Sequence, residues 1–313
     1  METYLTESPT EAAEFIKKGG VVAFPTETVY GLGANVFDEM AIAKIFAAKN
    51  RPNDNPLIAH VGDVAQIETL VAEITPSARI LIDAFFPAPL TLVLPKSDAV
   101  PLIATANLET IGVRMPKSVL AREFIKACAV PLVAPSANLS GKPSPTDWLA
   151  VNEDLNGKID CILKGTATEI GLESTVVDCT GAAPLVLRSG AVTLEDLQKI
   201  IPETRLYTIK NDEIVRSPGL KHKHYAPSAT VVLVNSRFEI QDSGKKAFIG
   251  LNAPREKFDL MKICHDANEY AREVFAFFRL CDQENIKTIY CETIAETGIG
   301  LALMDRLKRA AEQ

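Results

Sequence analysis

Residues 21–33 read Val21-Val22-Ala23-Phe24-Pro25-Thr26-Glu27-Thr28-Val29-Tyr30-Gly31-Leu32-Gly33 and set the pattern for the first two thirds of the chain. The first four of these residues are apolar and predict a short buried strand, which the following proline ends. A helix predicted over 10–18 precedes this strand and stops at a pair of glycines. A second helix is expected to begin at Asp38, whose carboxylate suits an N-cap. A buried strand between two helices is the repeating unit of an α/β domain.

The same alternation continues to about residue 206. Further β-like runs lie at 57–61, 90–94, 111–114, 131–134, 159–163 and 174–178. Helical patterns lie between them at 76–85, 117–128 and 193–200. We therefore predict an N-terminal α/β domain over residues 1–206.

Residues 207–229 break this rhythm, because they are basic and rich in turn-forming residues without periodicity. We interpret them as an interdomain linker. Beyond them, strands at 229–235, 246–251, 260–264 and 287–291 and helices at 266–281 and 299–311 predict a small parallel sheet. The expected C-terminal domain therefore covers residues 230–313.

Composition narrows the class of protein. Apolar residues make up 47% and charged residues 23%, as in ordinary globular domains. The formal net charge is −7, and residues 1–206 carry 17 basic against 25 acidic side chains. Because nucleic-acid binding relies on neutralising phosphates, any anion site in the first domain has to be local.

The sequence shows no membrane span, no signal peptide and no paired cysteines, and these features indicate the cellular compartment. The most apolar stretch, 84–94, contains two prolines and is too short to span a bilayer. The first seven residues are polar and acidic, whereas a signal peptide begins with basic residues and an apolar core. The six cysteines are far apart and show no C-x-x-C pair. We therefore expect a cytoplasmic protein with free thiols, without a disulfide framework or structural zinc.

Common nucleotide-binding motifs are missing from the sequence. It contains no G-x-x-x-x-G-K-[ST] loop, and neither Gly31-Leu32-Gly33 nor Gly298-Ile299-Gly300 completes a dinucleotide fingerprint. Neither a P-loop nor a Rossmann cofactor site is therefore predicted.

Polar residues at the ends of the predicted strands are the candidates for chemistry, since open α/β sheets bind ligands there. Lys49 and Arg51 suit a polyphosphate, or they complement the C-terminal dipole of their helix. Arg114 stands within an apolar strand, between Val113 and Met115, and its guanidinium either reaches solvent at a sheet edge or meets an anion in a cleft. Ser136-Ala137-Asn138 allows close approach of a ligand or forms an Asx turn.

Histidines and hydroxyl residues leave similar alternatives open. His60 stands alone in an apolar strand, where a histidine is more often part of the core than a ligand. His222 and His224 have a metal-like spacing, but without a third ligand nearby we interpret them as part of a solvated linker. Residues 26–33 either contribute to a ligand site or form an ordinary turn into the next element. Residues 173–175 either contribute to a ligand site or form the polar start of a strand.

Seven blocks in one order resemble the YrdC-like family of L-threonylcarbamoyladenylate synthases, in the long form with an additional C-terminal domain. The blocks are residues 24–33 (FPTETVYGLG), 49–52 (KNRP), 54–58 (DNPLI), 89–94 (PLTLVL), 113–116 (VRMP), 134–141 (APSANLSG) and 171–178 (GLESTVVD). The linker residues 217–219 and 224–227 are also similar to the long form. The resemblance implies a YrdC-like twisted mixed sheet with helices, followed by a small Rossmann-like βα domain.

The family's reaction joins L-threonine, bicarbonate or CO2, and ATP into threonylcarbamoyl-AMP and pyrophosphate, the first step of t6A37 modification of tRNA. The resemblance therefore implies an ATP-binding nucleotidyltransferase whose product passes to downstream t6A transferase machinery, with weak RNA or tRNA binding as a further option. No covalent nucleophile is demanded, because in-line attack on phosphorus needs neutralised charge and fixed geometry. Mg2+ is expected to be coordinated by ATP phosphates and water, with no protein metal site and no organic cofactor.

Site residues follow from the resemblance position by position. The nucleotide and its phosphates are expected to contact Lys49, Arg51, Asn55, Thr110, Ser136, Asn138, Ser144, Arg188 and Tyr225, with Lys49 and Arg51 as the catalytic pair. L-Threonine or its carbamate is expected to contact Thr28, His60, Arg114, the backbone of Ala134, and Ser174. Tyr225 would close over the nucleotide as part of a lid formed by residues 217–227.

Two other functions compete with this one. Related YrdC-like modules transfer carbamoyl groups, but they accompany zinc-finger cysteine pairs and an acylphosphatase-like segment that this sequence lacks. A double-stranded RNA or tRNA binder would have to rely on local, salt-sensitive contacts. Dependence of RNA binding on salt and on ATP distinguishes this alternative from the synthase.

Overall fold

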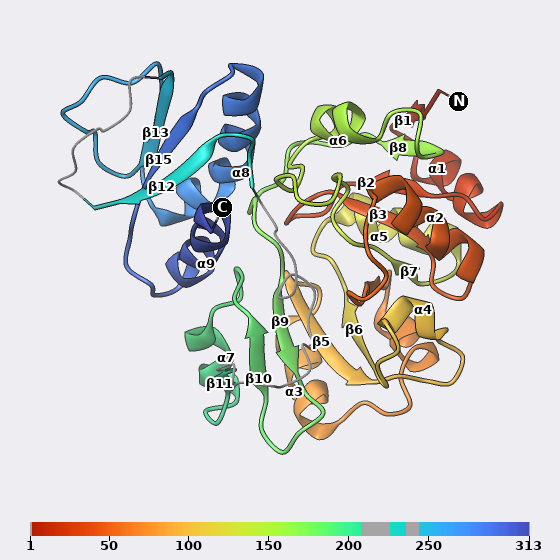
Figure 1. The fold of residues 1–313 in the computed structure, drawn as a ribbon. Helices are drawn as coiled ribbons and strands as arrows, with labels where there is room; N and C mark the ends of the chain where they lie inside the picture. The colour runs from red at the N-terminus through yellow and green to blue at the C-terminus, as the bar shows by residue number, and fades with distance from the viewer. Residues whose placement is uncertain (1, 208–225, 236–243, 313) are drawn as a thin grey trace.

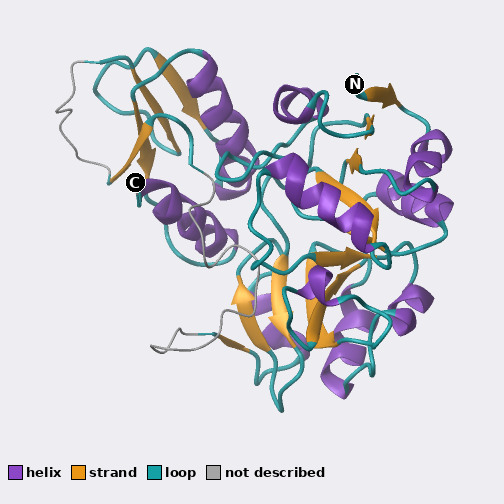
Figure 2. Cartoon of the chain, turned by 45° about the vertical axis from the view of Figure 1, so that its right-hand side comes forward, coloured by secondary structure: helices purple, strands orange, loops and turns teal. Residues whose placement is uncertain are grey.

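The computed structural model describes residues 2–207, 226–235 and 244–312. Its strands form two separate sheets, a large mixed one and a small parallel one (Figures 1 and 2). The predicted fold class, a mixed α/β sheet followed by a Rossmann-like βα unit, is confirmed. The predicted lid and Tyr225 fall largely or wholly on 208–225, outside the described residues.

The larger sheet has eleven strands in the described residues. Their spatial order is β1 (Tyr4–Thr6), β8 (Cys161–Leu163), β2 (Val22–Phe24), β3 (Gly31–Asn35), β7 (Leu132–Val133), β4 (Ile58–His60), β6 (Thr110–Arg114), β5 (Leu90–Pro95), β9 (Thr175–Asp178), β10 (Leu185–Arg188) and β11 (Arg205–Leu206). The strand β4 runs parallel to β6 and antiparallel to β7. The loops that follow β2 and β7, together with the last residues of β4 and β6, form much of the site described below.

The helices around this sheet begin where the sequence supplies caps. They are α1 (Pro9–Lys17), α2 (Glu39–Lys49), the 3-10 helix η1 (Val64–Thr69), α3 (Pro76–Phe85), α4 (Leu102–Thr105), α5 (Val119–Cys128), α6 (Trp148–Leu155) and α7 (Leu194–Ile200). The Asp38 carboxylate accepts a hydrogen bond from the Ala41 amide, as predicted for the N-cap of α2. At the other end of α2, Asn50 takes a left-handed conformation that stops the helix.

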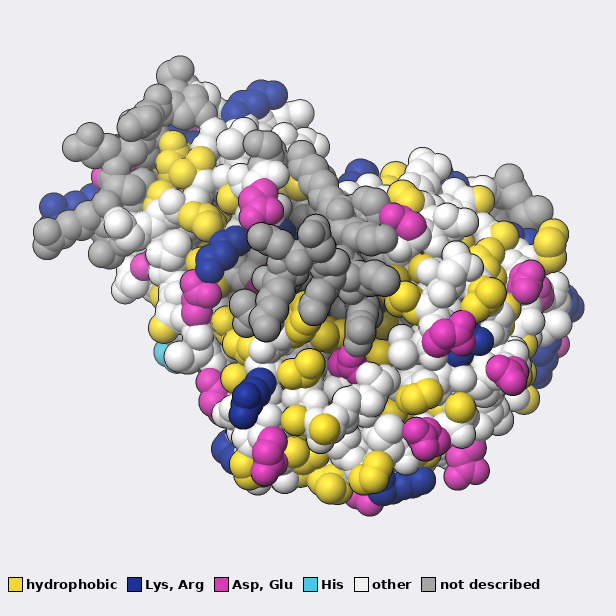
Figure 3. Space-filling view, turned by 60° about the horizontal axis from the view of Figure 1, so that its bottom comes forward, with side chains coloured by type: hydrophobic (Ala, Val, Ile, Leu, Met, Phe, Trp, Pro, Cys, Tyr) yellow, Lys and Arg dark blue, Asp and Glu magenta, His cyan; other side chains and the backbone are white. Residues whose placement is uncertain are grey.

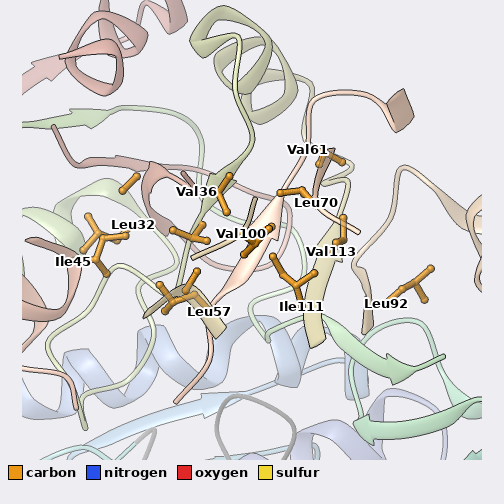
Figure 4. Packing of buried hydrophobic residues seen from close by; sticks show 14 of the residues in the cluster. Leu32, Val36, Ile45, Leu57, Val61, Leu70, Leu92, Val100, Ile111 and Val113 are labelled. Atoms are coloured by element: carbon orange, nitrogen blue, oxygen red, sulfur yellow. The ribbon is translucent and has the colours of Figure 1, made fainter. Parts of the chain in front are cut away.

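The core lies on both faces of the sheet because neighbouring residues of a strand point to opposite sides. In β2, Val22 and Phe24 pack into the cluster that α1 and α5 cover, whereas Ala23 packs into the largest cluster. Figure 4 shows part of that largest cluster, where Leu57, Ile111 and Val113 lie among side chains from other strands and helices. Buried apolar area on both faces fixes the strand order that positions the site.

The C-terminal unit comprises the described residues 226–235 and 244–312. Its parallel strands are ordered β12 (Thr230–Val234), β15 (Thr288–Glu292), β13 (Lys246–Gly250) and β14 (Leu260–Ile263). The helices α8 (Ala267–Gln283) and α9 (Ile299–Ala311) lie on the side of this sheet that faces the larger unit (Figures 1 and 2).

Two further expectations concern the membrane and the thiols. None of the helices in the described ranges has the length and apolarity needed to cross a bilayer. All six cysteines fall in the described residues and are buried free thiols, as predicted.

Candidate active site

One cleft in the larger unit gathers ten of the fourteen predicted site residues. It encloses about 700 Å³, its open mouth included, and is lined by Thr28, Arg51, His60, Arg114, Ala134, Ser136, Asn138, Ser144, Ser174 and Arg188, among others. His60 and Arg114 are register partners at the ends of the parallel strands β4 and β6. Strand ends thus bring together residues that are distant in the sequence, as expected for an α/β sheet.

Arg114 is held in place by a buried carboxylate. Its Nη2 donates to Glu27 Oε1 at 2.6 Å, and both side chains are almost completely buried. Burial alone would raise the pKa of Glu27, but the Arg114 guanidinium lowers it below its usual value. The Arg114 side chain also lines the cleft, which decides between the two sequence-based interpretations in favour of a guanidinium facing a ligand space.

His60 is both a core histidine and a lining residue. Its Nδ1 lies 3.1 Å from the Ile58 carbonyl oxygen, which can only accept, so Nδ1 carries the proton and Nε2 has a free lone pair. Burial and the nearby Arg114 guanidinium lower the pKa of His60 to about 3. The imidazole is therefore a neutral hydrogen-bond acceptor toward a ligand at physiological pH.

The lowered pKa of His60 predicts that this residue makes the stability of the folded state decrease at acidic pH. The folded pKa of about 3 lies below the ordinary value of 6.5, so between these pH values the unfolded chain binds the extra proton. The stabilisation is therefore present above about pH 6.5 and is lost as the pH falls toward 3. We expect urea unfolding to show a smaller loss of stability between pH 6.5 and 4.5 in His60→Gln than in the wild type.

The exposed His265 provides the matched control for this measurement. His265→Gln should keep the wild-type dependence of stability on pH. If the His60 imidazole instead titrated near pH 6.5 in NMR spectra, the neutral acceptor assigned to it would be wrong.

Lys49 lies behind the cleft wall rather than among its lining residues. Its side chain is 1% exposed, and Nζ donates to the carbonyl oxygens of Ser136, at 2.6 Å, and of Asn138. A third, longer contact of 3.4 Å reaches Asn138 Oδ1. Burial lowers the pKa of Lys49 well below its usual value, yet the three oxygens match the three N–H bonds of an ammonium. Lys49 thus fixes the backbone of residues 136–138, which line the cleft.

Three other predicted residues also lie outside the cleft lining or the described residues. Asn55 is buried; its carbonyl accepts from Arg51 Nη2 at 3.2 Å, and its Nδ2 has no hydrogen-bond partner in the described part of the chain. Thr110 lines a smaller neighbouring cavity that shares Leu57 with the cleft. Tyr225 lies outside the described residues.

Hydrogen bonds join residues predicted for threonine to residues predicted for ATP. Arg188 donates from Nε to the Ser174 carbonyl at 3.0 Å and from Nη2 to Ser174 Oγ at 3.1 Å. Ser174 Oγ lies 2.8 Å from Thr91 Oγ1. The two predicted subsites therefore meet at Ser174 and Arg188.

Sequence reasoning missed several residues at or behind the cleft wall. Lys142 and Glu173 line the cleft, and Glu27 supports Arg114 from behind. Glu27 and Glu173 stand inside quoted motifs, which was the available signal, but nothing in the local sequence indicated their partners.

Comparisons with known proteins identify the family of this chain. A family model described as "Telomere recombination" (Sua5, YciO and YrdC) matches residues 14–190. A second, described as "Threonylcarbamoyl-AMP synthase, C-terminal domain", matches residues 192–312. The two models together account for most of the chain.

Individual relatives and solved structures extend the match to nearly full length. Threonylcarbamoyl-AMP synthase of Pyrococcus abyssi is 44% identical, covering 96% of this chain and 93% of the relative. The Bacillus subtilis protein of the same name is 40% identical, covering 96% of this chain and 92% of the relative. The crystal structure of P. abyssi Sua5 complexed with L-threonine superposes with a TM-score of 0.92 at 42% identity, covering 99% of this chain and 97% of that one. The resemblance found in the sequence is confirmed, and the chain belongs to the Sua5/YciO/YrdC family of threonylcarbamoyl-AMP synthases, in its two-domain form.

Proposed function

We propose that the cleft converts L-threonine, bicarbonate or CO2, and ATP into threonylcarbamoyl-AMP and pyrophosphate, the first step of t6A modification of tRNA. The observation that carries this proposal is one cleft lined by three guanidinium groups, those of Arg51, Arg114 and Arg188. Such a set suits a carboxylate together with a polyphosphate, because guanidinium groups bind both with paired hydrogen bonds.

The two substrates divide the cleft between them. Thr28, His60, Arg114, the Ala134 backbone and Ser174 hold threonine or its carbamate, with the carboxylate on Arg114. Arg51, Ser136, Asn138, Ser144 and Arg188 contact ATP in the cleft. Asn55 supports Arg51 from outside the lining, Thr110 extends the nucleotide site from the neighbouring cavity, and Lys49 fixes the loop of residues 136–138. The meeting of Arg188 and Ser174 supports adjacent subsites, which a reaction between the two ligands needs.

Catalysis then consists of positioning and charge neutralisation. A carbamate oxygen attacks the α-phosphorus of ATP, a new P–O bond forms, and the bond to the β-phosphate oxygen breaks as pyrophosphate leaves. Arg51 and Arg188 neutralise the charge on the phosphates, as in other phosphoryl-type transfers. The side chains bind and orient, so no covalent nucleophile takes part.

Mg2+ enters this scheme as part of the substrate, Mg·ATP. Among the described residues, no group of three His, Cys, Asp or Glu side chains is placed to hold a metal ion. Glu173, the one carboxylate among the described lining residues, already accepts from Ser144 and from Arg306. In this proposal, phosphate oxygens of ATP and water supply the ligands of the ion, as Mg2+ prefers in nucleotide sites.

The first test is pyrophosphate release from Mg·ATP with L-threonine and bicarbonate each present or omitted. We expect release only when both are present. Arg51→Met should reduce kcat/KM for ATP about 100-fold, corresponding to roughly 2.7 kcal/mol of lost charge stabilisation.

Arg122→Met is the matched control, because that guanidinium donates to the carbonyls of Pro116 and Lys117 outside the cleft. It should leave turnover at the wild-type level. Pyrophosphate release that does not depend on threonine would contradict the proposal and favour carbamoyl transfer or RNA binding. Among the described residues on the face drawn in Figure 3, acidic and basic side chains are interspersed and form no continuous basic surface for an RNA backbone.

The wider setting of the reaction is also a proposal. We propose that the chain divides into an N-terminal domain of residues 1–206, a linker and a C-terminal domain of residues 230–313. We also propose that the protein is cytoplasmic and passes its intermediate to t6A machinery. Retention of tRNA by the wild type in a salt titration with and without ATP tests direct RNA binding.

A further inference from the structure

The C-terminal unit reaches the wall of the cleft through Arg306 of α9. The Arg306 side chain is 1% exposed, and its Nε donates to Glu173 Oε2 at 3.1 Å. The other oxygen of the same carboxylate accepts from Ser144 Oγ at 2.6 Å. Glu173 and Ser144 both line the cleft, so a residue of the C-terminal unit is one side chain away from the proposed ATP site.

A second arginine of the C-terminal unit holds the peptide before Ser144. Arg279, on α8, donates from Nη2 to the Pro143 carbonyl at 2.6 Å and to Asp154 Oδ2 at 2.7 Å. The remaining oxygen of Asp154 accepts from Nζ of Lys142, which lines the cleft. Residues 142–144 are therefore tied to α8 at the same time as the Ser144 hydroxyl is tied to α9 through Glu173.

Apolar packing makes this contact close and continuous. Val29 and Leu172, both from the larger unit, belong to the apolar cluster of the C-terminal unit, together with Phe275 and Leu307. Gly171 has a φ of +79°, and a Cβ there would lie 2.4 Å from the Arg272 carbonyl oxygen. The backbone next to Glu173 thus touches α8 with no room for a side chain.

The electrostatic arrangement gives Arg306 a role beyond packing. Burial would raise the pKa of Glu173, but Arg306 and Arg188 lower it below its usual value, so the carboxylate stays ionised. Without a cation behind it, the Glu173 carboxylate would repel a polyphosphate bound in the cleft. The buried Arg306 guanidinium, which also donates from Nη1 to Asp305 Oδ2, offsets the charge of Glu173 and holds the carboxylate that accepts from Ser144.

We propose that Arg306 is a positioning residue for ATP, which neutralises Glu173 and orients Ser144, so that the C-terminal unit completes the nucleotide side of the cleft. This inference rests on the proposed function only for the identity of the ligand.

The test compares Arg306→Met with the double variant Glu173→Gln plus Arg306→Met in the full chain. ATP binding is measured by titration calorimetry, and KM and kcat by pyrophosphate release. We expect the single variant to weaken ATP binding at least 10-fold and to raise KM for ATP, with KM for threonine changed less than 3-fold. Removing the carboxylate as well should restore ATP affinity to within about 3-fold of the wild type.

Lys308→Met on the same helix is the matched control, since Lys308 forms an exposed pair with Glu296. It should bind ATP like the wild type. Should Arg306→Met fail to fold, Arg306→Gln, which keeps a hydrogen-bond donor but no charge, takes its place in the same comparison.

Each outcome bears on the proposal. Unchanged ATP affinity in a folded single variant would overturn it, and so would a folded double variant that stays as weak as the single one, because that result indicates a purely structural role. A wild type that binds ATP without threonine-dependent release would refute the proposed function, while the calorimetric comparison would still decide the role of Arg306.

Discussion

Lys49→Met is expected to lower the free energy of unfolding by about 2–6 kcal/mol and to reduce threonine-dependent pyrophosphate release by at least about 100-fold. The substitution removes the donor shared by the Ser136 and Asn138 carbonyls, and each buried carbonyl left without a partner costs about 1–3 kcal/mol. The loop of residues 136–138 then shifts, and a displacement near 1 Å in a positioning element costs about 100-fold in rate. Urea unfolding and the pyrophosphate assay measure the two effects.

Lys44→Met is the control on the same helix, because Lys44 is exposed and donates to the Gly19 carbonyl away from the cleft. It should change both quantities little. A Lys49→Met protein that keeps wild-type stability but loses ATP affinity would contradict the loop-fixing role and indicate direct contact with the phosphates, as the resemblance implies.

Arg114→Met is the second change with a large expected effect. It leaves the Glu27 carboxylate buried without its partner, which costs about 3–5 kcal/mol of stability. It also removes the proposed ligand of the threonine carboxylate, and a charged hydrogen bond of about 1.5–3 kcal/mol corresponds to a roughly 10- to 150-fold rise in KM for threonine. Thermal or urea unfolding and threonine saturation curves measure these effects.

A double variant separates the two roles of Arg114. Glu27→Gln plus Arg114→Met removes both charges, so most of the lost stability should return while threonine affinity stays low. If threonine affinity returned together with stability, Arg114 would only support the fold. ATP affinity, measured in parallel, should remain within about 3-fold of the wild type.

Regular elements with clear caps and periodicity were predictable from the sequence. The helix predicted over 76–85 is α3, and the one predicted over 299–311 is α9. The strand β3 was missed because it contains Gly31 and Gly33, which have low strand propensity; it forms because β2 and β7 pair with it on both sides. The helix α6 and the strand β10 were also missed, since short elements carry weak periodic signals.

The residues of the candidate site were also predictable from the sequence only in part. Ten of the predicted residues line the cleft, because their motifs lie at strand ends that the α/β fold gathers in one place. The position of Lys49 behind the wall was not predictable, since the direction of a buried ammonium depends on which carbonyls lie near it. Sequence motifs identify residue types at a site, but not which of them face the ligand.

By itself, the sequence determined the α/β class, the two-unit organisation and the candidate residues, because hydrophobic period, caps and motif order are local properties of the chain. Only the tertiary structure decided the pairs Arg114–Glu27 and Arg306–Glu173, whose members are separated by 87 and 133 residues. Burial makes those pairs necessary: a carboxylate removed from water needs a cation beside it, and which cation is near depends on how the sheets and helices pack.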